Sequence, residues 1–440
     1  MTLTKNSFDI PSLPQLHGGS HLPSPLTSIH PSNFINDDKH RVLFNIYEDE
    51  NPENNQLTYE RAGPRQDIYW NPEDVRAAIV TCGGLAPGLN NVIQSLVAML
   101  NRYGVKYIYG VPFGYAGFHT NPETGSFHYP WRHLNSKDLS QLNSEAGSFL
   151  GTSRGHSDAK TIVDALVNRN INMIFTIGGD GTLRGANAIY EEAQKRKLPI
   201  SVVGIPKTID NDILYVSKSF GFETAVEKAT EALQCAHVEA RSVINGVGIV
   251  KIMGRNSGAL TANAAAACTG VDFVIVPEIP LKLEGENGFL NVCTERLIQQ
   301  NYITIAVAEG TGQDLIDTDE VHYDASGNKK LKNIGLFLKD KLVSHFKEQE
   351  VEYSMKYIDP SYMVRSQVTT SSDSLFCSRL GQNAAHAAMA GKTGLMIGLS
   401  HNHFTHVPLS LVSQGKKELD INGPLWMSVM ASTGQPASWE

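Results

Sequence analysis

The sequence predicts a doubly wound α/β architecture, in which helices cover both faces of a mainly parallel sheet. Short apolar runs, of the kind found in buried strands, alternate with segments of helical period along most of the chain. Several of these runs end in glycine turns or acidic residues, at the edge where ligands bind in such sheets. Because 440 residues are too many for one small core, we expect two domains.

The bulk composition argues against several classes of protein. A formal net charge of −8 and the lack of a basic stripe argue against a nucleic-acid partner. No apolar run reaches the roughly 18 residues of a membrane span, and the first residues lack the apolar core of a signal peptide. The five cysteines lie far apart without a CxxC pair, so we expect reduced thiols and a cytoplasmic location.

Residues 1–73 differ from the rest of the chain. Pro, Ser, His and Asn recur there, and an apolar pattern is present only at 42–47. We expect an extension that lies over the core or against another subunit, with one edge strand and no chemistry of its own.

Regular structure is expected from Val75 onward. A buried-type strand at 77–81 leads into the glycine turn CGGLAPGLN, and a helix follows at 91–103. A strand at 107–111 comes next. After a polar loop, the segment GSFLGTSR ends in the cation Arg154.

The centre of the prediction is the stretch 173–212, which a helix carrying Ile162 and Leu166 precedes. An apolar run at 173–177 is followed by GGDGT, a helical segment, a second apolar run at 200–205 and then KTIDND. Two adjacent parallel strands would bring their acidic ends to one crevice. This pattern favours a phosphoryl-transfer site.

The remaining elements continue the alternation of strand and helix. We expect a helix at 224–241, a strand at 247–253, a closely packed small-residue helix at 259–267, strands at 273–277 and 303–307, a loop at 313–333 and a helix at 334–348. The segment KYIDPSYMVR (356–365) follows them.

Two glycine turns, at Gly83-Gly84 and at Gly178 to Gly181, each join a strand to a helix. Glycine there allows a tight turn and lets a phosphate lie against amides at the helix N-terminus, although any strand-to-helix junction can use glycine for packing alone. Two such turns, one of them with an acid, favour polyphosphate binding. Asp180 either caps the helix or holds Mg²⁺, which binds through one or two carboxylates together with phosphate oxygens.

The residues after the second strand could supply a general base. Asp210 and Asp212 flank Asn211, a pattern that fits either a local turn or a carboxylate that accepts a proton from an attacking hydroxyl. Arg154, Arg255 and Arg365 each follow a strand or a turn. One such arginine is usually a surface residue, but three are better explained as a phosphate clamp.

Two other patterns resemble known sites without matching them. HAAMAGKT (386–393) lacks the first glycine of a P-loop and the preceding strand. HNHFTH (401–406) has three histidines but no companion carboxylate or cysteine cluster, so we do not expect a metal there.

Taken together, the motifs resemble those of the 6-phosphofructokinase family over about residues 75–410. They are CGGLAPGLNNVI (82–93), SFLGTSRG (148–155), IGGDGT (177–182), PKTIDND (206–212), KIMGR (251–255), AEG (308–310) and YIDPSYMVR (357–365). GGDGT also occurs in NAD kinases and lipid kinases, but PKTIDND and the MGR segment separate this chain from them.

The resemblance implies two similar doubly wound α/β domains with the active site in the cleft between them, plus the N-terminal extension. The implied divisions are an extension at 1–73, a donor domain at 74–221 with 364–415, a sugar-phosphate domain at 222–363 and a tail at 416–440. It also implies an allosteric, cytoplasmic enzyme of glycolysis that is a homodimer or homotetramer.

The implied reaction is Mg²⁺-dependent transfer of a phosphoryl group from ATP to the 1-hydroxyl of fructose 6-phosphate, with no membrane partner. Asp210 would be the base and Asp180 would hold Mg²⁺. The donor would be surrounded by Gly84, Arg154, Gly155, Gly179, Asp180, Gly181 and Thr182. The sugar phosphate would be held by Thr208, Ile209, Asp210, Met253, Gly254, Arg255, Glu309, Lys356, Tyr362, Met363, Val364 and Arg365.

Two positions bear on the donor. Pyrophosphate-dependent members of the family usually have Asp at the position of Gly181, where a carboxylate would repel the α-phosphate of ATP. Gly181 therefore favours ATP. Lys207 points the other way, because typical bacterial ATP enzymes have Gly there. The combination is similar to the plant and kinetoplastid ATP-dependent group, and we give position 181 more weight since it faces the nucleotide directly.

The chain departs from the bacterial pattern at two positions. Gly246 replaces an arginine that reaches a neighbouring subunit's substrate phosphate, so that contact is in doubt unless Lys356 or Arg241 compensates. Leu85 replaces the Asp usual in the first glycine turn. We therefore do not transfer bacterial allosteric control to this chain. A pyrophosphate-dependent enzyme and a non-catalytic subunit of the same fold remain as alternatives.

Overall fold

The computed structural model describes residues 12–28, 35–46, 57–121, 123–155, 158–316, 323, 330–412 and 414–439. The chain divides into two compact units. Unit 1 comprises residues 1–208, 213–221 and 368–415, and unit 2 comprises 209–212, 222–367 and 416–440. The N-terminal extension thus belongs to unit 1 and the C-terminal tail to unit 2.

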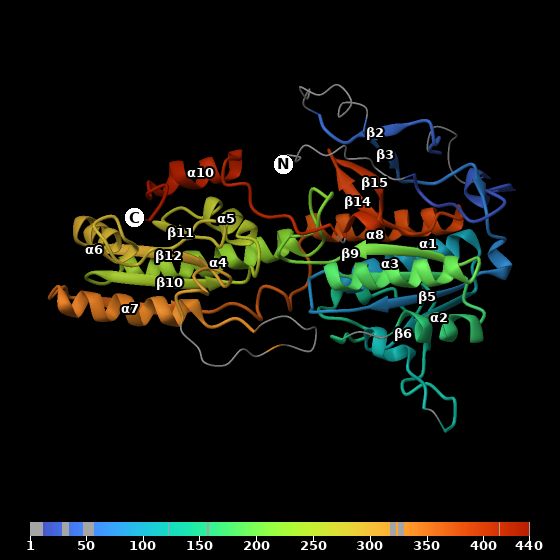
Figure 1. Cartoon of the computed structure of the whole chain (residues 1–440), viewed down its shortest axis with the longest axis horizontal. Coiled ribbons are helices and arrows are strands. Elements are labelled where there is room, and N and C mark those ends of the chain that lie inside the picture. Colours follow the sequence, from blue (N-terminus) through green and yellow to red (C-terminus); the bar gives the residue numbers. More distant parts are fainter. Residues whose placement is uncertain are drawn as a thin grey trace. The chain divides into compact units, whose positions relative to one another are not determined.

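Unit 1 is built on a mixed sheet that has nine strands within the described ranges (Figure 1). In sheet order these are β2 (Arg41–Leu43), β3 (Thr58–Arg61), β15 (His403–Pro408), β14 (Leu395–Ser400), β9 (Ser201–Pro206), β8 (Met173–Gly178), β5 (Arg76–Thr81), β6 (Tyr107–Val111) and β7 (Arg132–His133). The strands from β14 to β6 are parallel, and the outer strands are antiparallel. A separate short pair, β1 (Leu22–Pro23) and β4 (Asp67–Ile68), joins two parts of the extension.

Helices cover both faces of this sheet because side chains alternate along each strand. Ala77 and Ile79 of β5 pack in one core with α1 (Leu89–Tyr103) and α8 (Ser371–Met389). Ala78 and Val80 face the other core, with α2 (Ala159–Asn168) and α3 (Asp180–Lys195). The short helix α9 (Leu409–Val412) also lies against α3.

Unit 2 is built on a parallel sheet that has four strands within the described ranges. In sheet order these are β11 (Phe273–Ile275), β12 (Tyr302–Ala308), β10 (Gly246–Ile252) and β13 (Ser354–Ile358). One face packs on α6 (Phe289–Gln300) and α7 (Ile334–Glu348). The other face packs on α4 (Phe222–Arg241) and α5 (Ala259–Ala266). Helix α10 (Pro424–Thr433) contacts α5.

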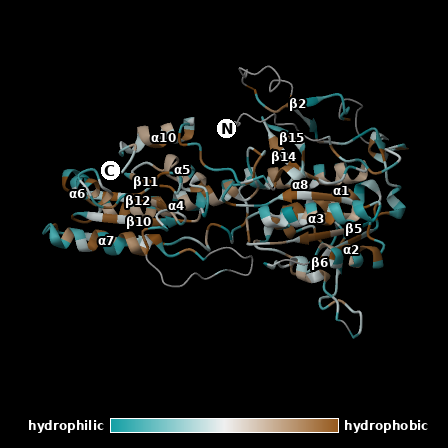
Figure 2. Ribbon diagram, in the orientation of Figure 1, coloured by the Kyte–Doolittle hydropathy of each residue, from teal (hydrophilic) through white to brown (hydrophobic). Residues whose placement is uncertain are grey.

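In both units the central strands are hydrophobic, and helices such as α1 and α3 have one hydrophobic side (Figure 2). This is the distribution expected when a sheet is buried on both faces. The predicted α/β class is therefore confirmed. Within the described ranges, no helix has both the length and the apolar character needed to cross a membrane.

Most of the expected elements are present, with boundaries that differ by a few residues. Strand 107–111 and helix 334–348 have the predicted bounds. The edge strand expected at 42–47 is the shorter β2, and Tyr47 lies outside the described residues, as does most of the expected loop at 313–333. Strands β13, β14 and β15 were not predicted.

Candidate active site

The first glycine turn follows β5 and is fixed by backbone bonds from two other segments. Cys82 N donates to Ile177 O at the end of β8, and Gly83 N donates to Ser153 O at 3.0 Å. The Thr152 hydroxyl donates to Gly83 O. Gly83 has φ +85°, a conformation that favours glycine. The structure thus brings the segment that carries the exposed Arg154 and Gly155 beside Gly84, as the sequence predicted for the donor residues.

The second glycine turn joins β8 to α3. Gly178 has no space for a side chain, since a Cβ would lie 2.2 Å from Thr182 Oγ1. Gly181 is the opposite case: a Cβ there would meet no other atom within 4 Å. The first amides of α3 are therefore bordered by open space on the side of Gly181, where an anionic ligand can approach them.

Asp180 is the first helical residue of α3 and does not occupy the cap position, which is Gly179. Its carboxylate is mostly buried and forms an ion pair with Arg184 at 3.0 Å, one helical turn further on. The sequence analysis missed Arg184, although its spacing of four residues from Asp180 was a usable signal. The arginine orients the carboxylate.

The donor set around Asp180 fits Mg²⁺ but not a metal held entirely by the protein. Within the described ranges, no group of three or more His, Cys, Asp or Glu side chains could hold a metal ion. Mg²⁺ commonly uses one or two carboxylates and takes its remaining ligands from phosphates and water. A single carboxylate beside a turn that is predicted to bind phosphate meets that requirement.

Lys207 links the two glycine turns. Its backbone N donates to Gly178 O at 2.9 Å, and its ammonium group donates to Gly84 O. The side chain is buried, and a Cβ on Gly83 would lie 3.3 Å from Nζ. A positive charge is therefore fixed among the residues predicted for the donor. The next residue, Thr208, is the last of its segment of unit 1, and its carbonyl accepts a bond from Ser219.

The turn Ile209–Asp212 begins unit 2, with Asn211 in the left-handed region at φ +53°. Asp212 is buried and Asp210 is partly buried, with its Oδ1 atom shielded from solvent. Burial, followed by the nearby charges of Asp212 and Glu309, raises the pKa of Asp210 to about 7, although Lys416 and a hydrogen bond from the Arg255 backbone act in the opposite direction. Asp210 therefore has the proton affinity of a general base that works near neutral pH.

Glu309 and the MGR segment meet at the carboxyl ends of β12 and β10. Glu309 N donates to Ile252 O at 2.9 Å, and Gly310 N donates to Gly254 O at 3.1 Å. A Cβ on Gly310 would lie 2.0 Å from Arg255 O, so glycine is required for this approach. Burial raises the pKa of Glu309, and Lys251 opposes that effect. The MGR segment and Glu309 thus lie side by side at this edge of the sheet.

Lys251 is a further charged residue of this edge that the sequence analysis did not identify. Its ammonium group lies 2.7 Å from Asp359 Oδ2, just past the end of β13. Together with the hydrogen bonds from Ser361, this contact keeps the pKa of Asp359 low although partial burial would raise it. The side chain position was predictable in principle, because alternate residues of β10 share a face.

The remaining acceptor residues lie on or after β13. Lys356 is within the strand, paired with Gly248, and its side chain is exposed. Tyr362 and Met363 are exposed, at 74% and 61%, and the Arg365 guanidinium lies over the Tyr362 ring at 5.1 Å. Val364 is fully buried, so it anchors this segment while its neighbours remain accessible.

Gly246 cannot be replaced by any larger residue. It opens β10, where a Cβ would lie 1.9 Å from Ala240 O. The close approach of α4 to β10 therefore excludes the bacterial arginine at this position on steric grounds. Arg241, at the end of α4, borders a shallow pocket of about 580 Å³ with Ile244 and Tyr353.

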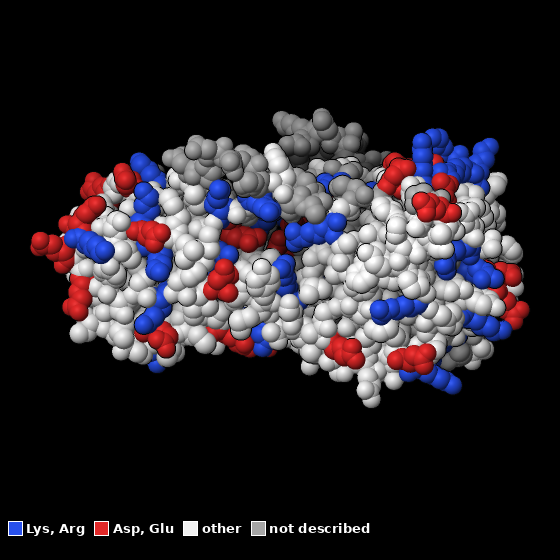
Figure 3. Space-filling view, turned by 90° about the horizontal axis from the view of Figure 1, so that it is seen from below, with Lys and Arg blue, Asp and Glu red and all other residues white. Residues whose placement is uncertain are grey.

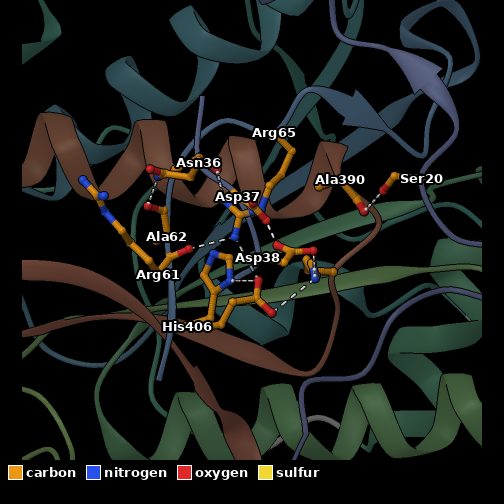
Figure 4. A network of polar contacts seen from close by, with 12 residues as sticks. Ser20, Asn36, Asp37, Asp38, Arg61, Ala62, Arg65, Ala390 and His406 are labelled. Atoms are coloured by element: carbon orange, nitrogen blue, oxygen red, sulfur yellow. Dashed lines mark hydrogen bonds and ion pairs between the residues drawn. The ribbon is translucent and has the colours of Figure 1, made fainter. Parts of the chain in front are cut away.

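The two look-alike motifs form a structural ion-pair network in unit 1. Lys392 of HAAMAGKT lies 3.2 Å from Glu60, and His406 of HNHFTH lies 3.0 Å from the same carboxylate. Arg65 bonds to Glu60 at 3.0 Å and to Asp38 at 2.7 Å (Figure 4). One residue of each motif thus pairs with a carboxylate of the N-terminal extension. The network borders a pocket of about 860 Å³.

Comparisons with known proteins agree with this arrangement. The family model described as phosphofructokinase matches residues 76–388. A protein of Borreliella burgdorferi named ATP-dependent 6-phosphofructokinase is 46% identical over 440 residues, covering 98% of this chain and 97% of that protein. One of the same name from Amycolatopsis methanolica is 42% identical over 391 residues, covering 87% and 83%.

Plant relatives and solved structures extend the comparison. ATP-dependent 6-phosphofructokinase 5, chloroplastic, of Arabidopsis thaliana is 45% identical over 376 residues, covering 86% of this chain and 69% of the relative. A crystal structure titled pyrophosphate-dependent phosphofructokinase from Nitrosospira multiformis matches with a TM-score of 0.67 at 18% identity, covering 83% of this chain and 93% of that one. At that identity the structural match concerns the fold alone. The sequence matches cover most of the chain, and the chain belongs to the phosphofructokinase family.

Proposed function

We propose that the protein is an ATP-dependent 6-phosphofructokinase, a glycolytic phosphotransferase that converts fructose 6-phosphate and ATP to fructose 1,6-bisphosphate and ADP. The observation that carries the choice of donor is the open space at Gly181, beside the N-terminus of α3. The names of the Borreliella, Amycolatopsis and Arabidopsis relatives support the same choice.

Asp210 is proposed as the general base. Its carboxylate takes the proton of the sugar's 1-hydroxyl as that oxygen attacks the γ-phosphorus of ATP, and ADP leaves with the electrons of the broken P–O bond. A base with a pKa near 7 is partly ionised at neutral pH and binds the proton more strongly than an exposed aspartate. Most of the remaining catalysis in this reaction class comes from positioning and charge stabilisation.

The donor is proposed to bind to unit 1. Gly84, Arg154, Gly155 and the segment Gly179–Thr182 supply backbone amides and a guanidinium group for the phosphates. Lys207 adds a fixed charge near both turns. Asp180 would hold Mg²⁺, which when bound neutralises the charge of the donor phosphates.

The sugar phosphate is proposed to bind to unit 2, with Thr208 at the end of its unit 1 segment. Arg255 and Arg365 are the guanidinium groups available for its phosphate, since such groups bind phosphate in a bidentate manner. Met253, Gly254, Glu309, Lys356 and the segment Tyr362–Val364 would surround the sugar. The exposure of Tyr362 and Met363 supports a role in contact with a ligand.

Pyrophosphate use is the second candidate, because a lysine stands at position 207 and its ammonium group is fixed near the donor residues. The purified protein should be incubated with fructose 6-phosphate, Mg²⁺ and either ATP or pyrophosphate. We expect turnover with ATP. Turnover with pyrophosphate alone would contradict the proposal, and no turnover with either donor would favour a non-catalytic subunit.

Replacing Gly181 tests the role of the open space. In Gly181→Asp we expect the Michaelis constant for ATP to rise at least about tenfold, because the new carboxylate would stand near the α-phosphate and repel it. Gly181→Ala is the matched control, since it adds bulk without charge, and it should have a clearly smaller effect. An unchanged Michaelis constant for ATP in Gly181→Asp would remove the donor argument.

We further propose a homo-oligomer in the cytoplasm. Large apolar side chains of unit 2 are exposed, among them Ile244 at 69%, and such side chains are common at subunit contacts. All five cysteines lie in described parts of the chain and are free thiols, which suits a reducing compartment. Light scattering coupled to size-exclusion chromatography would distinguish a monomer from a dimer or tetramer.

A further inference from the structure

The C-terminal tail contributes charge to the turn that carries the predicted base. Lys416 is the first residue of the tail, and its ammonium group lies 3.2 Å from Asp212 Oδ2. The Asp212 side chain is 8% exposed and that of Lys416 is 36% exposed, so the pair is at the edge of the protein interior. The sequence assigned no role to Lys416, because 204 residues separate it from Asp212.

The backbone of the tail holds this lysine in place. Lys417 N donates to Asp212 O at 2.9 Å, and Leu419 N donates to Glu278 Oε1 at 2.8 Å. Glu278 also accepts from Gly258 N at the start of α5. The segment 416–419 is therefore attached both to the turn of Asp210 and to a helix of the same unit.

Further bonds fix the rest of the tail to unit 2. The Gln435 side chain pairs with both backbone groups of Val274 on β11, at 2.6 Å and 3.2 Å. Trp439 packs against Phe273 and Phe289 in the core. Because the tail is anchored at both ends, the Lys416–Asp212 pair is a fixed feature of the turn.

The charges around Asp210 explain why such a pair matters. Asp212 from the same turn and Glu309 from the end of β12 are both acidic, whereas Lys416 and the Arg255 backbone favour the ionised form. Lys251 and Asp359 lie one step further out, around Glu309. Burial lowers the pKa of Lys417 to about 8, and Asp212 opposes that effect. Lys416 is a side-chain cation in this set that favours the ionised form of Asp210.

We propose that Lys416 is a positioning residue, whose ammonium group holds and neutralises the Asp212 carboxylate and thereby keeps Asp210 in its proton-accepting form. The proposal rests on the proposed function, in which Asp210 is the base. Lys416 acts through Asp212 and need not touch a substrate. An opposite charge close to an acid favours its ionised form, but partial exposure of Lys416 to solvent limits the size of the effect.

The test is the pH profile of kcat/KM for fructose 6-phosphate at saturating ATP and Mg²⁺. In Lys416→Met, which keeps the side chain's length but removes its charge, we expect the acidic limb to move up by roughly half to one unit. On the acidic side of the profile, kcat/KM of the variant should be about three- to tenfold lower than that of the wild type. At alkaline pH the two values should become similar. Lys416→Arg should restore the wild-type limb.

Two controls separate this effect from a structural one. Lys347→Met removes an exposed lysine in the last turn of α7 and should leave the limb in place. In an Asp212→Asn background, Lys416→Met should move the limb by clearly less, because the carboxylate that Lys416 holds and neutralises is gone. An unmoved limb in Lys416→Met, or an equal loss at every pH, would overturn the proposal. If Lys416→Met does not fold, Lys416→Gln serves the same test.

Asp210→Ala distinguishes failure of this proposal from failure of the proposed function. Near-normal turnover in Asp210→Ala would show that Asp210 is not the base and would overturn both. Loss of turnover in Asp210→Ala together with an unmoved limb in Lys416→Met would overturn the role of Lys416 alone.

Discussion

Two buried or partly buried carboxylates, Glu60 in unit 1 and Asp210 in unit 2, have opposite electrostatic surroundings. Burial by itself would raise the pKa of both. Around Glu60, the hydrogen bond from His406 and the charges of Lys392 and Arg65 outweigh burial and hold the pKa well below its usual range. Around Asp210, the neighbouring acids Asp212 and Glu309 add to burial, and the pKa rises to about 7.

The difference shows which buried acid is structural and which can take part in chemistry. A carboxylate surrounded by cations has little tendency to bind a proton, so Glu60 is suited to joining segments together. A carboxylate beside other acids binds a proton near neutral pH, which is what a general base requires. When two carboxyl groups of one protein have pKa values that differ widely, they commonly have different roles.

The charged surface does not show this distinction. On the face in Figure 3, acidic and basic side chains of the described residues are interspersed, without a continuous basic stripe. The informative charges of the protein are the buried ones.

The largest expected effect is on catalysis. Asp210→Ala should lower kcat by about 10³-fold or more, because the attacking hydroxyl loses its proton acceptor. ATP binding should be retained, since the proposed donor residues are in unit 1. Steady-state kinetics and a nucleotide-binding titration would measure the two properties. Near-normal turnover would show that Asp210 is not the base and that its raised pKa has no catalytic role.

Local sequence patterns predicted much of the fold and the grouping of many proposed site residues. Apolar runs and helical periods gave the elements β5, α1, β8, β9 and α7, because burial on both faces of a parallel sheet leaves a strong local signal. The glycine turns and the acids after the strands followed from the same pattern. These strands, helices and turns could be predicted because each is determined by residues that are close together in the sequence.

The outer part of the unit 1 sheet was not predicted. The residues of β14 and β15 form an antiparallel hairpin through His401 and Asn402, which both have positive φ. Asn favours such a conformation and was a usable signal for a turn, but this segment was considered only as a possible metal site because of its histidines. The pairing of β3 with β15 had no local signal, because it joins residues more than 300 positions apart.

The charge state of the site could not be predicted for a similar reason. Glu60 and Lys392 are 332 residues apart, and Asp212 and Lys416 are 204 residues apart. Whether a buried acid lies beside a cation or beside another acid depends on such contacts. The sequence therefore predicted Asp210 as a base but gave no reason for its raised pKa.

The next largest effect is on the attachment of the N-terminal extension. Glu60→Gln keeps the side chain's shape but removes the buried counter-charge of Lys392 and Arg65, which still pair with the exposed Asp38. The loss should cost about 3 kcal/mol locally. Because the pKa of Glu60 is lowered by folding, its contribution is complete above its usual value of 4.5 and is lost as the pH falls below that value. Glu60→Gln should therefore be compared with the wild type at pH 7.

Hydrogen exchange measured by mass spectrometry can locate this effect. Peptides covering β3 and β15 should exchange about 100-fold faster in Glu60→Gln, whereas peptides of unit 2 should be unchanged. Glu73→Gln is the control, since Glu73 forms only an exposed pair with Lys106 at 3.8 Å and should change stability by less than about 0.5 kcal/mol. Equal exchange in both variants would show that the Glu60 network does not hold the extension.

The smallest expected effect is a gain in stability when the charge of Asp210 is removed. Folding raises the pKa of Asp210 from 3.8 to about 7, so the folded protein binds an extra proton at intermediate pH and loses stability as the pH rises through that range. Asp210→Asn lacks this cost. We expect its Tm to exceed that of the wild type by about 2–5 °C at pH 8, where the cost is complete, and by less than half as much at pH 5.

The exposed Asp314→Asn should show no such pH-dependent difference. Thermal unfolding at the two pH values would measure it, and an Asp210→Asn protein that is less stable than the wild type at pH 8 would mean that the ionised carboxylate is compensated, as Glu60 is.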